Sequence, residues 1–240
     1  ETIYGTDLYL YNRMEPSIWG ANEEFISCPQ LDDLQCAYTS LQGFLKGANK
    51  QSINVFACFD NEEVGSGTKQ GAGSTFLYDA MRRINNALGK GEEEYYRALA
   101  SSFMLSADNA HAVHPNHPAK TDVNNCVYMN EGIVVKSHAG QKYTSDAVSI
   151  AVFKGLCKKA GVPVQFFSNR SDTAGGSTLG NIAMAQVSMN SVDIGLPQLA
   201  MHSSYETAGV KDTAYMIKVM EEFFNSHIEE MSGHILKVTK

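Results

Sequence analysis

Four short stretches of the sequence place acidic residues or a histidine directly beside apolar segments. They centre on Asp32, on the neighbours Glu62 and Glu63, on Asp108 and on His202. The last three stretches follow apolar runs typical of buried strands, and ligands of open α/β sheets bind beyond the carboxyl ends of the strands. We therefore expect these side chains to meet at one rim of a sheet. Converging carboxylates are costly unless a cation neutralises them, so the pattern predicts a divalent metal site.

The donor types indicate which metals such a site would hold. Mixed carboxylate and histidine ligands suit Zn²⁺, Mn²⁺ or Co²⁺, and one carboxylate can bridge two ions about 3.5 to 4 Å apart. Because Glu62 and Glu63 are neighbours, their side chains point in different directions, so one can hold a cation while the other faces a bound water. A solvated loop at Glu62 and Glu63, and helix capping by Asp32 and Asp33, are the alternatives.

Apolar patterns predict the elements that would carry these residues. Helical spacing predicts helices near 34–45, 77–88, 95–100, 148–156 and 216–223, and apolar runs predict strands at 53–59, 102–107, 133–135, 164–167 and 192–201. Strands that alternate with helices indicate a three-layer α/β/α fold around a mainly parallel mixed sheet. We expect short strands and loops in residues 1–27. Residues 109–131, rich in His, Pro and Asn, predict a long surface excursion beside the site.

The composition describes a globular chain and argues against several partners. The 240 residues are 43% hydrophobic, which is enough for a sizeable core. A net charge of −7 without a Lys/Arg cluster argues against nucleic acid, and no apolar run approaches the roughly 20 residues that cross a membrane. The five cysteines form no Cys-x-x-Cys pair, and no basic, apolar signal sequence opens the chain. We therefore expect reduced, buried thiols in a cytoplasmic protein.

The four stretches also carry a family resemblance. The chain resembles the aspartyl aminopeptidase (M18) family of metallopeptidases in four metal-site motifs, which occur in the family's order: Gln-Leu-Asp32-Asp-Leu, Phe-Asp-Asn-Glu62-Glu63-Val-Gly-Ser, Ser-Ala-Asp108-Asn-Ala-His-Ala-Val-His-Pro-Asn and Pro-Gln-Leu-Ala-Met-His202-Ser. The resemblance extends over nearly all 240 residues and is weakest in residues 1–25. It implies a zinc-peptidase fold of the aminopeptidase type. It also implies two divalent metal ions per site, Zn²⁺ first, with Mn²⁺ or Co²⁺ as alternatives.

The resemblance assigns a role to each residue of the motifs. Asp32 resembles the carboxylate that bridges two metal ions, and Glu63 and Asp108 resemble terminal ligands. His202 resembles the ligand of the second ion, and Glu62 resembles the general base. These roles agree with the chemistry of the residue types, since a metal-activated water needs a carboxylate that accepts its proton and passes it to the leaving amine.

Three further residues are implied as substrate contacts: Lys136, Tyr143 and His111. A lysine near an acidic metal centre could select an acidic N-terminal residue of the substrate. The alternatives are a surface position for Lys136, a packed side chain for Tyr143 and a hydrogen bond behind the metal ligands for His111. The histidines without a motif are assigned to the surface or to ordinary packing: His117, His138, His227 and His234.

The chain departs from the family pattern in its upstream part. Family members have another metal-binding histidine in a His-x-Asp motif far upstream and an inserted dimerisation domain, whereas the first histidine here is His111. We therefore expect residues 1–240 to form the catalytic metallopeptidase domain without its N-terminal segment and without the inserted dimerisation domain. One metal ion would then lack an imidazole ligand.

The predicted function is removal of N-terminal residues, Asp or Glu, from peptide substrates. The resemblance implies that the protein acts as a large homo-oligomer, a dodecamer. One alternative is an aminopeptidase for neutral or basic N-terminal residues. Another is a catalytically incomplete fragment with a structural role, which the missing upstream histidine favours and the intact metal and base motifs oppose.

Overall fold

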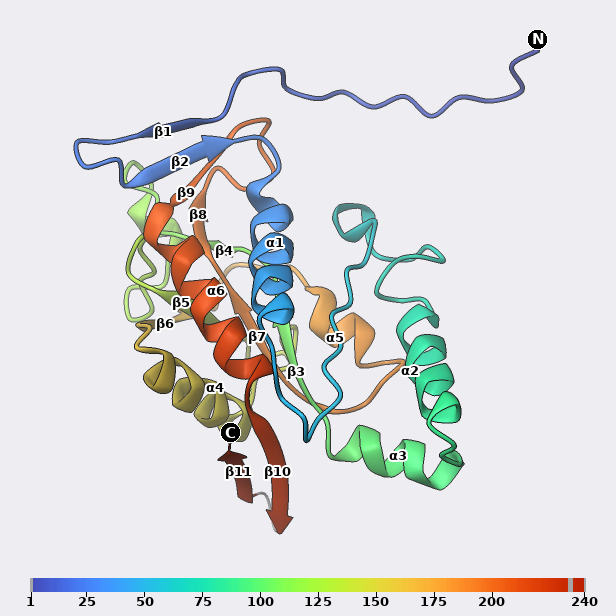
Figure 1. Cartoon of the computed structure of the whole chain (residues 1–240). Coiled ribbons are helices and arrows are strands. Elements are labelled where there is room, and N and C mark those ends of the chain that lie inside the picture. Colours follow the sequence, from blue (N-terminus) through green and yellow to red (C-terminus); the bar gives the residue numbers. More distant parts are fainter. Residues whose placement is uncertain (1, 233–234, 240) are drawn as a thin grey trace.

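The computed structural model describes residues 2–232 and 235–239 and arranges helices around a central sheet (Figure 1). Its helices are α1 (Leu31–Leu45), α2 (Phe76–Ala87), α3 (Glu92–Ala100), α4 (Ala147–Ala160), α5 (Leu179–Ala183) and α6 (Val210–Phe224), with single 3-10 turns η1 (Glu62–Val64) and η2 (Pro118–Lys120). Its strands are β1 (Ser17–Trp19), β2 (Phe25–Cys28), β3 (Phe103–Ala107), β4 (Ala110–His111), β5 (Ile133–Ser137), β6 (Val164–Ser168), β7 (Asn190–Gly195), β8 (Pro197–Leu199), β9 (Glu206–Gly209), β10 (His227–Ser232) and β11 (Ile235–Thr239). This is the predicted α/β class.

The central sheet has the strand order β3-β7-β5-β6. β3 pairs with β7, and β5 pairs with β6, in parallel. β5 and β7 pair antiparallel, with Val135 opposite Ile194. The sheet is therefore mixed, as predicted, with its antiparallel pair in the middle.

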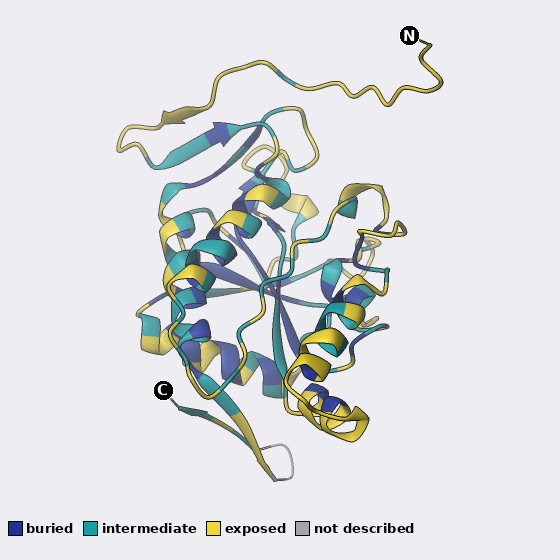
Figure 2. Ribbon diagram, turned by 45° about the vertical axis from the view of Figure 1, so that its right-hand side comes forward, coloured by how far each residue is buried: buried dark blue, intermediate teal, exposed yellow. Residues whose placement is uncertain are grey.

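Different helices cover the two faces of this sheet (Figure 2). On β7, Val192 and Ile194 face a core that includes Phe153 of α4 and residues of α1 and α6. Between them, Asp193 faces α5, where its carboxylate lies against Gly180. Because successive strand residues point to opposite faces, this alternation separates an apolar layer from a layer that carries polar groups. The three-layer prediction agrees with this arrangement.

A second sheet, with the order β1-β2-β9-β8-β4, adjoins the central one. Along the chain, β3 is followed by β4, and β7 is followed by β8. β3 pairs with β7 in parallel in the central sheet, and β4 pairs with β8 in parallel in the second sheet. Two adjacent segments therefore pass together from one sheet to the other. Gly195 allows this close approach, because an added Cβ there would collide with the carbonyl oxygen of Asp108. Asp108 consequently lies at the junction of the two sheets.

The predicted buried strand at 53–59 is wrong. The segment has no strand pairing among the described residues, and Ile53 is 63% exposed. Its aromatic side chains pack on helices instead, Phe56 near Phe44 of α1 and Phe59 near Phe76 of α2. A short apolar run does not distinguish a strand from a segment that packs through its side chains alone.

Several other predictions differ at the bounds of the elements. The predicted strand 192–201 is two strands, β7 and β8, which belong to different sheets. Lys136 lies within β5 rather than at its end. α3 begins at Glu92, three residues before the predicted start, and the acidic residues of its first turn complement the helix dipole. The predicted closing helix α6 is followed by the hairpin β10–β11.

The predicted excursion 109–131 is partly anchored. Residues 115–120 are exposed, but Asn109, Ala110 and Val127 are buried. The backbone N–H of Val113 donates to the carbonyl of Val127, which closes the excursion at its base. The loop therefore has a fixed stem beside Asp108 and an exposed tip.

Two statements about composition can be compared with the structure. All five cysteines are free, but only Cys36 and Cys157 are buried as predicted, whereas Cys58 is exposed and Cys28 and Cys126 are half-buried. Within the described residues, none of the helices combines the length and the apolar character that a membrane span requires.

Candidate metal centre

Asp32, Glu63 and His202 come from three separate elements and meet in one group, which we call the imidazole cluster. His202 Nε2 lies 3.2 Å from Asp32 Oδ2 and 3.2 Å from Glu63 Oε2. Asp32 lies at the start of α1, Glu63 lies in η1, and His202 follows β8. The structure thus brings together three of the predicted ligands, although Glu63 reaches the group from a 3-10 turn rather than from a strand end.

The fourth predicted ligand, Asp108, has different partners. Its Oδ2 accepts hydrogen bonds from Lys136 Nζ at 2.9 Å and from Thr178 Oγ1 at 3.0 Å. Lys136 also donates to the carbonyl oxygen of Asn109 at 3.0 Å. We call Asp108, Lys136 and Thr178 the lysine cluster. Its carboxylate is neutralised by a cation that the protein itself supplies.

Asp32 links Asp108 to the imidazole cluster. The ligand atoms of Asp32, Glu63 and His202 lie within 4.8 Å of one another, and so do those of Asp32, Asp33 and Asp108. Among the described residues, Asp32 Oδ1 and Asp33 Oδ1 are buried without a hydrogen-bond partner. Buried carboxylate oxygens that lack a partner indicate a place for a cation. Oxygen and imidazole donors in this combination fit Zn²⁺.

The pKa values of the carboxyl groups reflect their different partners. Burial, together with repulsion from Asp108 and Glu63, raises the pKa of Asp32 to about 8. Burial also raises the pKa of Asp33. Burial acts in the same direction on Asp108, but the charge of Lys136 and the hydrogen bonds from Lys136 and Thr178 together outweigh it, so the pKa of Asp108 is lowered. A cation bound at Asp32 would lower the pKa of that carboxyl in the same way.

Glu62, the predicted general base, precedes Glu63 in η1 and is half-buried. Burial, followed by repulsion from Asp108 and Glu63, raises the pKa of Glu62 to about 7. A general base works best when its pKa lies near the working pH. Backbone hydrogen bonds from Gly65 to Glu62 and from Ser66 to Asn61 hold the turn. The alternative of a freely solvated loop therefore does not describe this segment.

The capping alternative for Asp32 and Asp33 also differs from the structure. The residue before α1 is Gln30, with a φ of 62°, and no side-chain capping hydrogen bond is formed there. Asp32 and Asp33 themselves have non-helical backbone angles. The Asp32 carboxylate is directed to the cluster with His202 instead.

The predicted substrate contacts lie around the lysine cluster. Lys136 is only 3% exposed, which excludes a surface position, and its Nζ lies 5.5 Å from the centre of the Tyr143 ring. Tyr143 is buried against Val134 and Phe167, and this burial raises its pKa. The His111 side chain is accessible to solvent, but surrounding protein atoms and then the charge of His202 lower its pKa. Contact of these residues with substrate stays a prediction.

The remaining histidines have ordinary surroundings where the structure describes them. His227 Nδ1 lies 2.7 Å from Ser52 Oγ, and His138 Nδ1 accepts the backbone N–H of Gly140 at 2.9 Å. The ring of His117 lies near that of His114. His234 lies outside the described residues.

Sequence reasoning missed residues that support the site. Thr178, just before α5, donates to Asp108. Glu206, the first residue of β9, accepts the backbone N–H groups of both Asp32 and His202. Glu206 lies four residues after His202, but its role depends on the fold, and nothing in its local sequence distinguishes it from an ordinary acidic residue.

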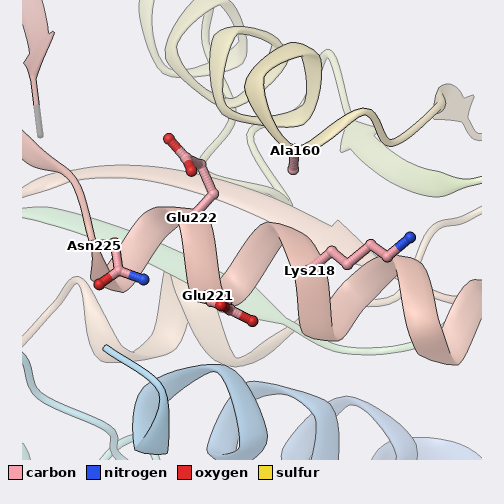
Figure 3. A pocket seen from close by; sticks show the side chains of 5 residues that line it. All are labelled: Ala160, Lys218, Glu221, Glu222 and Asn225. Carbon is pink, nitrogen blue, oxygen red and sulfur yellow. The ribbon is translucent and has the colours of Figure 1, made fainter. Parts of the chain in front are cut away.

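Two pockets of the structure do not coincide with this centre. One, of about 460 Å³, is lined by Ala160 of α4 and by Lys218, Glu221, Glu222 and Asn225 around α6 (Figure 3). The other, of about 410 Å³, is largely apolar and includes Trp19, Leu199 and Thr207. Leu199 and Thr207 alternate with Gln198 and Glu206 along their strands, so this pocket lies on the face of the second sheet opposite to Glu206.

Carboxylates and an imidazole at the margin of a mixed α/β sheet form a candidate metal centre, and comparisons with known proteins identify the class of protein as metallopeptidase. The family model described as "Aminopeptidase I zinc metalloprotease (M18)" matches residues 1–224. The chain belongs to the M18 family of aminopeptidases.

Individual relatives show how far the similarity extends. The probable M18 family aminopeptidase 2 of Clostridium acetobutylicum is 48% identical over 225 residues, which are 94% of this chain and 52% of that protein. The protein of the same name from Pseudomonas aeruginosa is 38% identical over 226 residues, 94% of this chain and 52% of that protein. The chain therefore spans about half the length of the curated relatives it matches.

Solved structures give the same picture. An M18 aminopeptidase from Thermotoga maritima has a TM-score of 0.82 at 26% identity, covering 90% of this chain and 49% of that one. Yeast aminopeptidase 1 has a TM-score of 0.78 at 28% identity, covering 89% of this chain and 49% of that one. The predicted fold class is confirmed.

Proposed function

We propose that this chain carries the catalytic centre of a dinuclear-metal aminopeptidase that removes N-terminal residues from peptides. The observation that carries the proposal is the sharing of Asp32 between two candidate ligand groups. Asp32 would bridge the ions, Glu63 and His202 would hold one of them, and Asp108 would contribute to the other. The family's description favours Zn²⁺, with Mn²⁺ or Co²⁺ as alternatives.

The residues of the chain then have separate tasks in hydrolysis. When bound, the ions supply Lewis acidity, which polarises the scissile carbonyl and lowers the pKa of a water molecule. Glu62 accepts the proton of the attacking water and delivers it to the leaving amine. Its pKa of about 7 gives it access to both protonation states near neutral pH. Because Glu63 is a neighbouring ligand, the backbone of η1 keeps Glu62 beside the reacting atoms.

The preference for the N-terminal residue divides the proposal into two versions. Asp or Glu is preferred if the Lys136 ammonium turns from Asp108 to the substrate. The ion pair between Lys136 and Asp108, at 2.9 Å, favours the second version, in which the lysine stays committed and neutral or basic residues are accepted. The Lys136–Asp108 ion pair concerns only the preference for the N-terminal residue, and the proposed metal chemistry is the same for either preference.

The larger architecture is part of the proposal as well. We propose that residues 1–240 make up most of the catalytic domain and that the protein forms a large homo-oligomer. One structural relative is described as a dodecamer of aminopeptidase 1 from yeast. Residues 3–11 run along an extended segment away from the helices (Figure 1), and their large apolar side chains, among them Tyr4, Leu8 and Leu10, are exposed. Such a segment is suited to burial in an interface, and the mass measured by light scattering tests the assembly.

Hydrolysis of amino-acid p-nitroanilides tests the proposed activity. The purified protein is stripped with a chelator, dialysed, and assayed with Asp, Leu and Lys substrates after addition of Zn²⁺, Mn²⁺ or Co²⁺. We expect turnover that depends on added metal. The fastest substrate decides between the two versions. Absence of turnover with every metal and substrate would contradict the proposal and support the alternative of a catalytically incomplete fragment.

A further inference from the structure

Glu206 is a buried carboxylate whose two oxygens each accept a backbone N–H of a candidate metal ligand. Its Oε2 accepts the N–H of Asp32 at 2.9 Å, and its Oε1 accepts the N–H of His202 at 2.8 Å. Glu206 is only 2% exposed. We propose that Glu206 is a positioning residue, which holds Asp32 and His202 at the separation that a metal ion requires. This inference rests on the proposed function.

The two residues that Glu206 joins are far apart in sequence and lie on different elements. Asp32 lies at the start of α1, directly after β2, whereas His202 lies in the turn between β8 and β9. β9 pairs with both β2 and β8, so its first residue lies between the two chain segments. A single side chain at this point reaches the backbones of both ligands.

The turn that carries His202 needs support from outside its own sequence. Ala200 and His202 have φ values of 58° and 65°, in the left-handed region that residues other than glycine rarely adopt. Such conformations persist when the surroundings over-determine them. Within the turn, Ser203 donates to the carbonyl of Ala200, and the hydrogen bond from His202 to Glu206 ties the turn to β9. The imidazole is 63% exposed, so its own side-chain packing does little to fix its position.

The chemistry of the two contacts requires a carboxylate. Both partners are N–H donors, so both oxygens of Glu206 must accept. A glutamine of the same length offers one acceptor oxygen and one NH₂ group, which cannot accept. It would therefore release either Asp32 or His202. Groups that orient metal ligands from behind affect metal affinity by about 10- to 100-fold when they are replaced.

Asp212 provides a matched control for Glu206. It is also a fully buried carboxylate that accepts two backbone N–H groups, those of Asn130 and Gly132. None of these contacts involves a candidate metal ligand. Loss of one acceptor at Asp212 therefore reports the general effect of disturbing a buried, doubly bonded carboxylate in this fold.

The test compares Zn²⁺ binding by the parent protein with binding by Glu206→Gln and Asp212→Asn. The dissociation constant is measured by competition with a chromophoric chelator, and the Tm of the metal-free proteins is measured alongside. We expect the dissociation constant of Glu206→Gln to be about 10- to 100-fold larger than that of the parent. We expect less than a twofold change for Asp212→Asn, although its Tm falls too. Equal affinities in all three proteins, or equal losses in both variants, would overturn the inference.

Hydrogen exchange of the metal-free proteins separates this inference from the proposed function. We expect faster exchange at the amides of Asp32 and His202 in Glu206→Gln than in the parent or in Asp212→Asn. Unchanged exchange would overturn the positioning role. A parent protein that binds no Zn²⁺ would contradict the proposed function, whereas the exchange result would still test the contacts of Glu206. If Glu206→Gln does not fold, Glu206→Asp takes its place. If neither variant folds, Glu206 is required for folding as a whole, which would contradict the proposal that it acts by positioning Asp32 and His202.

Discussion

The imidazole cluster and the lysine cluster are both built on carboxylates near Asp32, but they are balanced differently. In the lysine cluster, Asp108 accepts from a buried ammonium and a hydroxyl, and its pKa is lowered. In the imidazole cluster, Asp32 faces Glu63 and a single imidazole, and burial, followed by repulsion from Asp108 and Glu63, raises the pKa of Asp32 to about 8. In the part of the chain that the structure describes, no Lys or Arg ion pair reaches Asp32 or Glu63.

This difference separates a carboxylate that the fold itself supplies with a cation from carboxylates that have no protein cation beside them. A buried ion pair between two protein groups is satisfied whether or not a ligand is present, so it is part of the fold. A group of carboxylates without its own cation is completed by an added one. We therefore expect the Lys136–Asp108 pair to stabilise the metal-free protein, and the imidazole cluster to contribute to stability only when a cation is bound. Three substitutions in or beside the clusters test this comparison, and a fourth concerns a buried carboxyl elsewhere.

The largest effect is expected from Glu62→Gln, which alters the proton acceptor beside the imidazole cluster and leaves the predicted ligands in place. We expect kcat to fall by about 10²- to 10⁴-fold, the usual contribution of a general base, with Zn²⁺ content unchanged. Steady-state kinetics and metal analysis measure the two quantities. The control is Asp60→Asn, an exposed acid two residues earlier. Hydrolysis by Glu62→Gln at the parent's rate would remove Glu62 from the mechanism.

Lys136→Met addresses the lysine cluster. It leaves the Asp108 carboxylate buried without its cation, so we expect the metal-free protein to lose about 3–5 kcal/mol of unfolding free energy. Denaturant unfolding measures this loss. The control is Lys218→Met, which replaces an exposed lysine of α6 and should change stability by less than about 0.5 kcal/mol. Equal effects of the two substitutions would remove the distinction between the clusters.

His202→Asn addresses the imidazole cluster, and asparagine tolerates the left-handed backbone at this position. Without metal we expect only a small change in stability, because the His202 side chain is 63% exposed. With Zn²⁺ at 100 times the parent's Kd, the parent gains about 2.7 kcal/mol and the variant gains less. Thermal unfolding with and without Zn²⁺ measures both effects. A variant stabilised as much as the parent would show that the ion binds elsewhere.

The smallest effect concerns Asp212, a carboxyl outside both clusters. Burial raises its pKa from 3.8 to about 7, against the opposing effect of the N–H groups of Asn130 and Gly132. Between those pH values the folded protein holds a proton that the unfolded chain has released. The contribution of Asp212 to unfolding free energy therefore falls as the pH rises from about 4 to about 7. Urea unfolding of Asp212→Asn should show a flatter pH dependence than the parent; parallel curves would contradict this.

Much of the site could be predicted because its residues follow local patterns. Asp108 follows an apolar run that is a strand, β3, and strand ends are where α/β sheets place functional groups. The imidazole cluster was predicted from residue types that suit a metal. Glu62 and Glu63 were found for the same reason, although the run before them is not a strand. Their chemistry was a better guide than the predicted secondary structure.

Other parts of the site depend on contacts that a local pattern does not encode. Glu206 accepts the backbone N–H of Asp32, which lies 174 positions away in the sequence. Because every residue except proline carries a backbone N–H, the residue types give no sign of this contact. Lys136 was expected near substrate, but its burial follows from the pairing of β5 with β6 and β7 on its two sides. Gly195 ends β7 where the Asp108 backbone lies against it, and the apolar run alone does not indicate this close approach.

The central proposal is that Asp32 would bridge two metal ions, and anomalous diffraction from crystals of the Zn²⁺-loaded protein tests it most directly. Data collected on either side of the zinc absorption edge locate each ion without reference to activity. The account predicts two peaks on opposite sides of the Asp32 carboxylate, about 3.5 to 4 Å apart, with one of them at Glu63 and His202. A single zinc peak, or zinc bound away from the imidazole cluster, would contradict it.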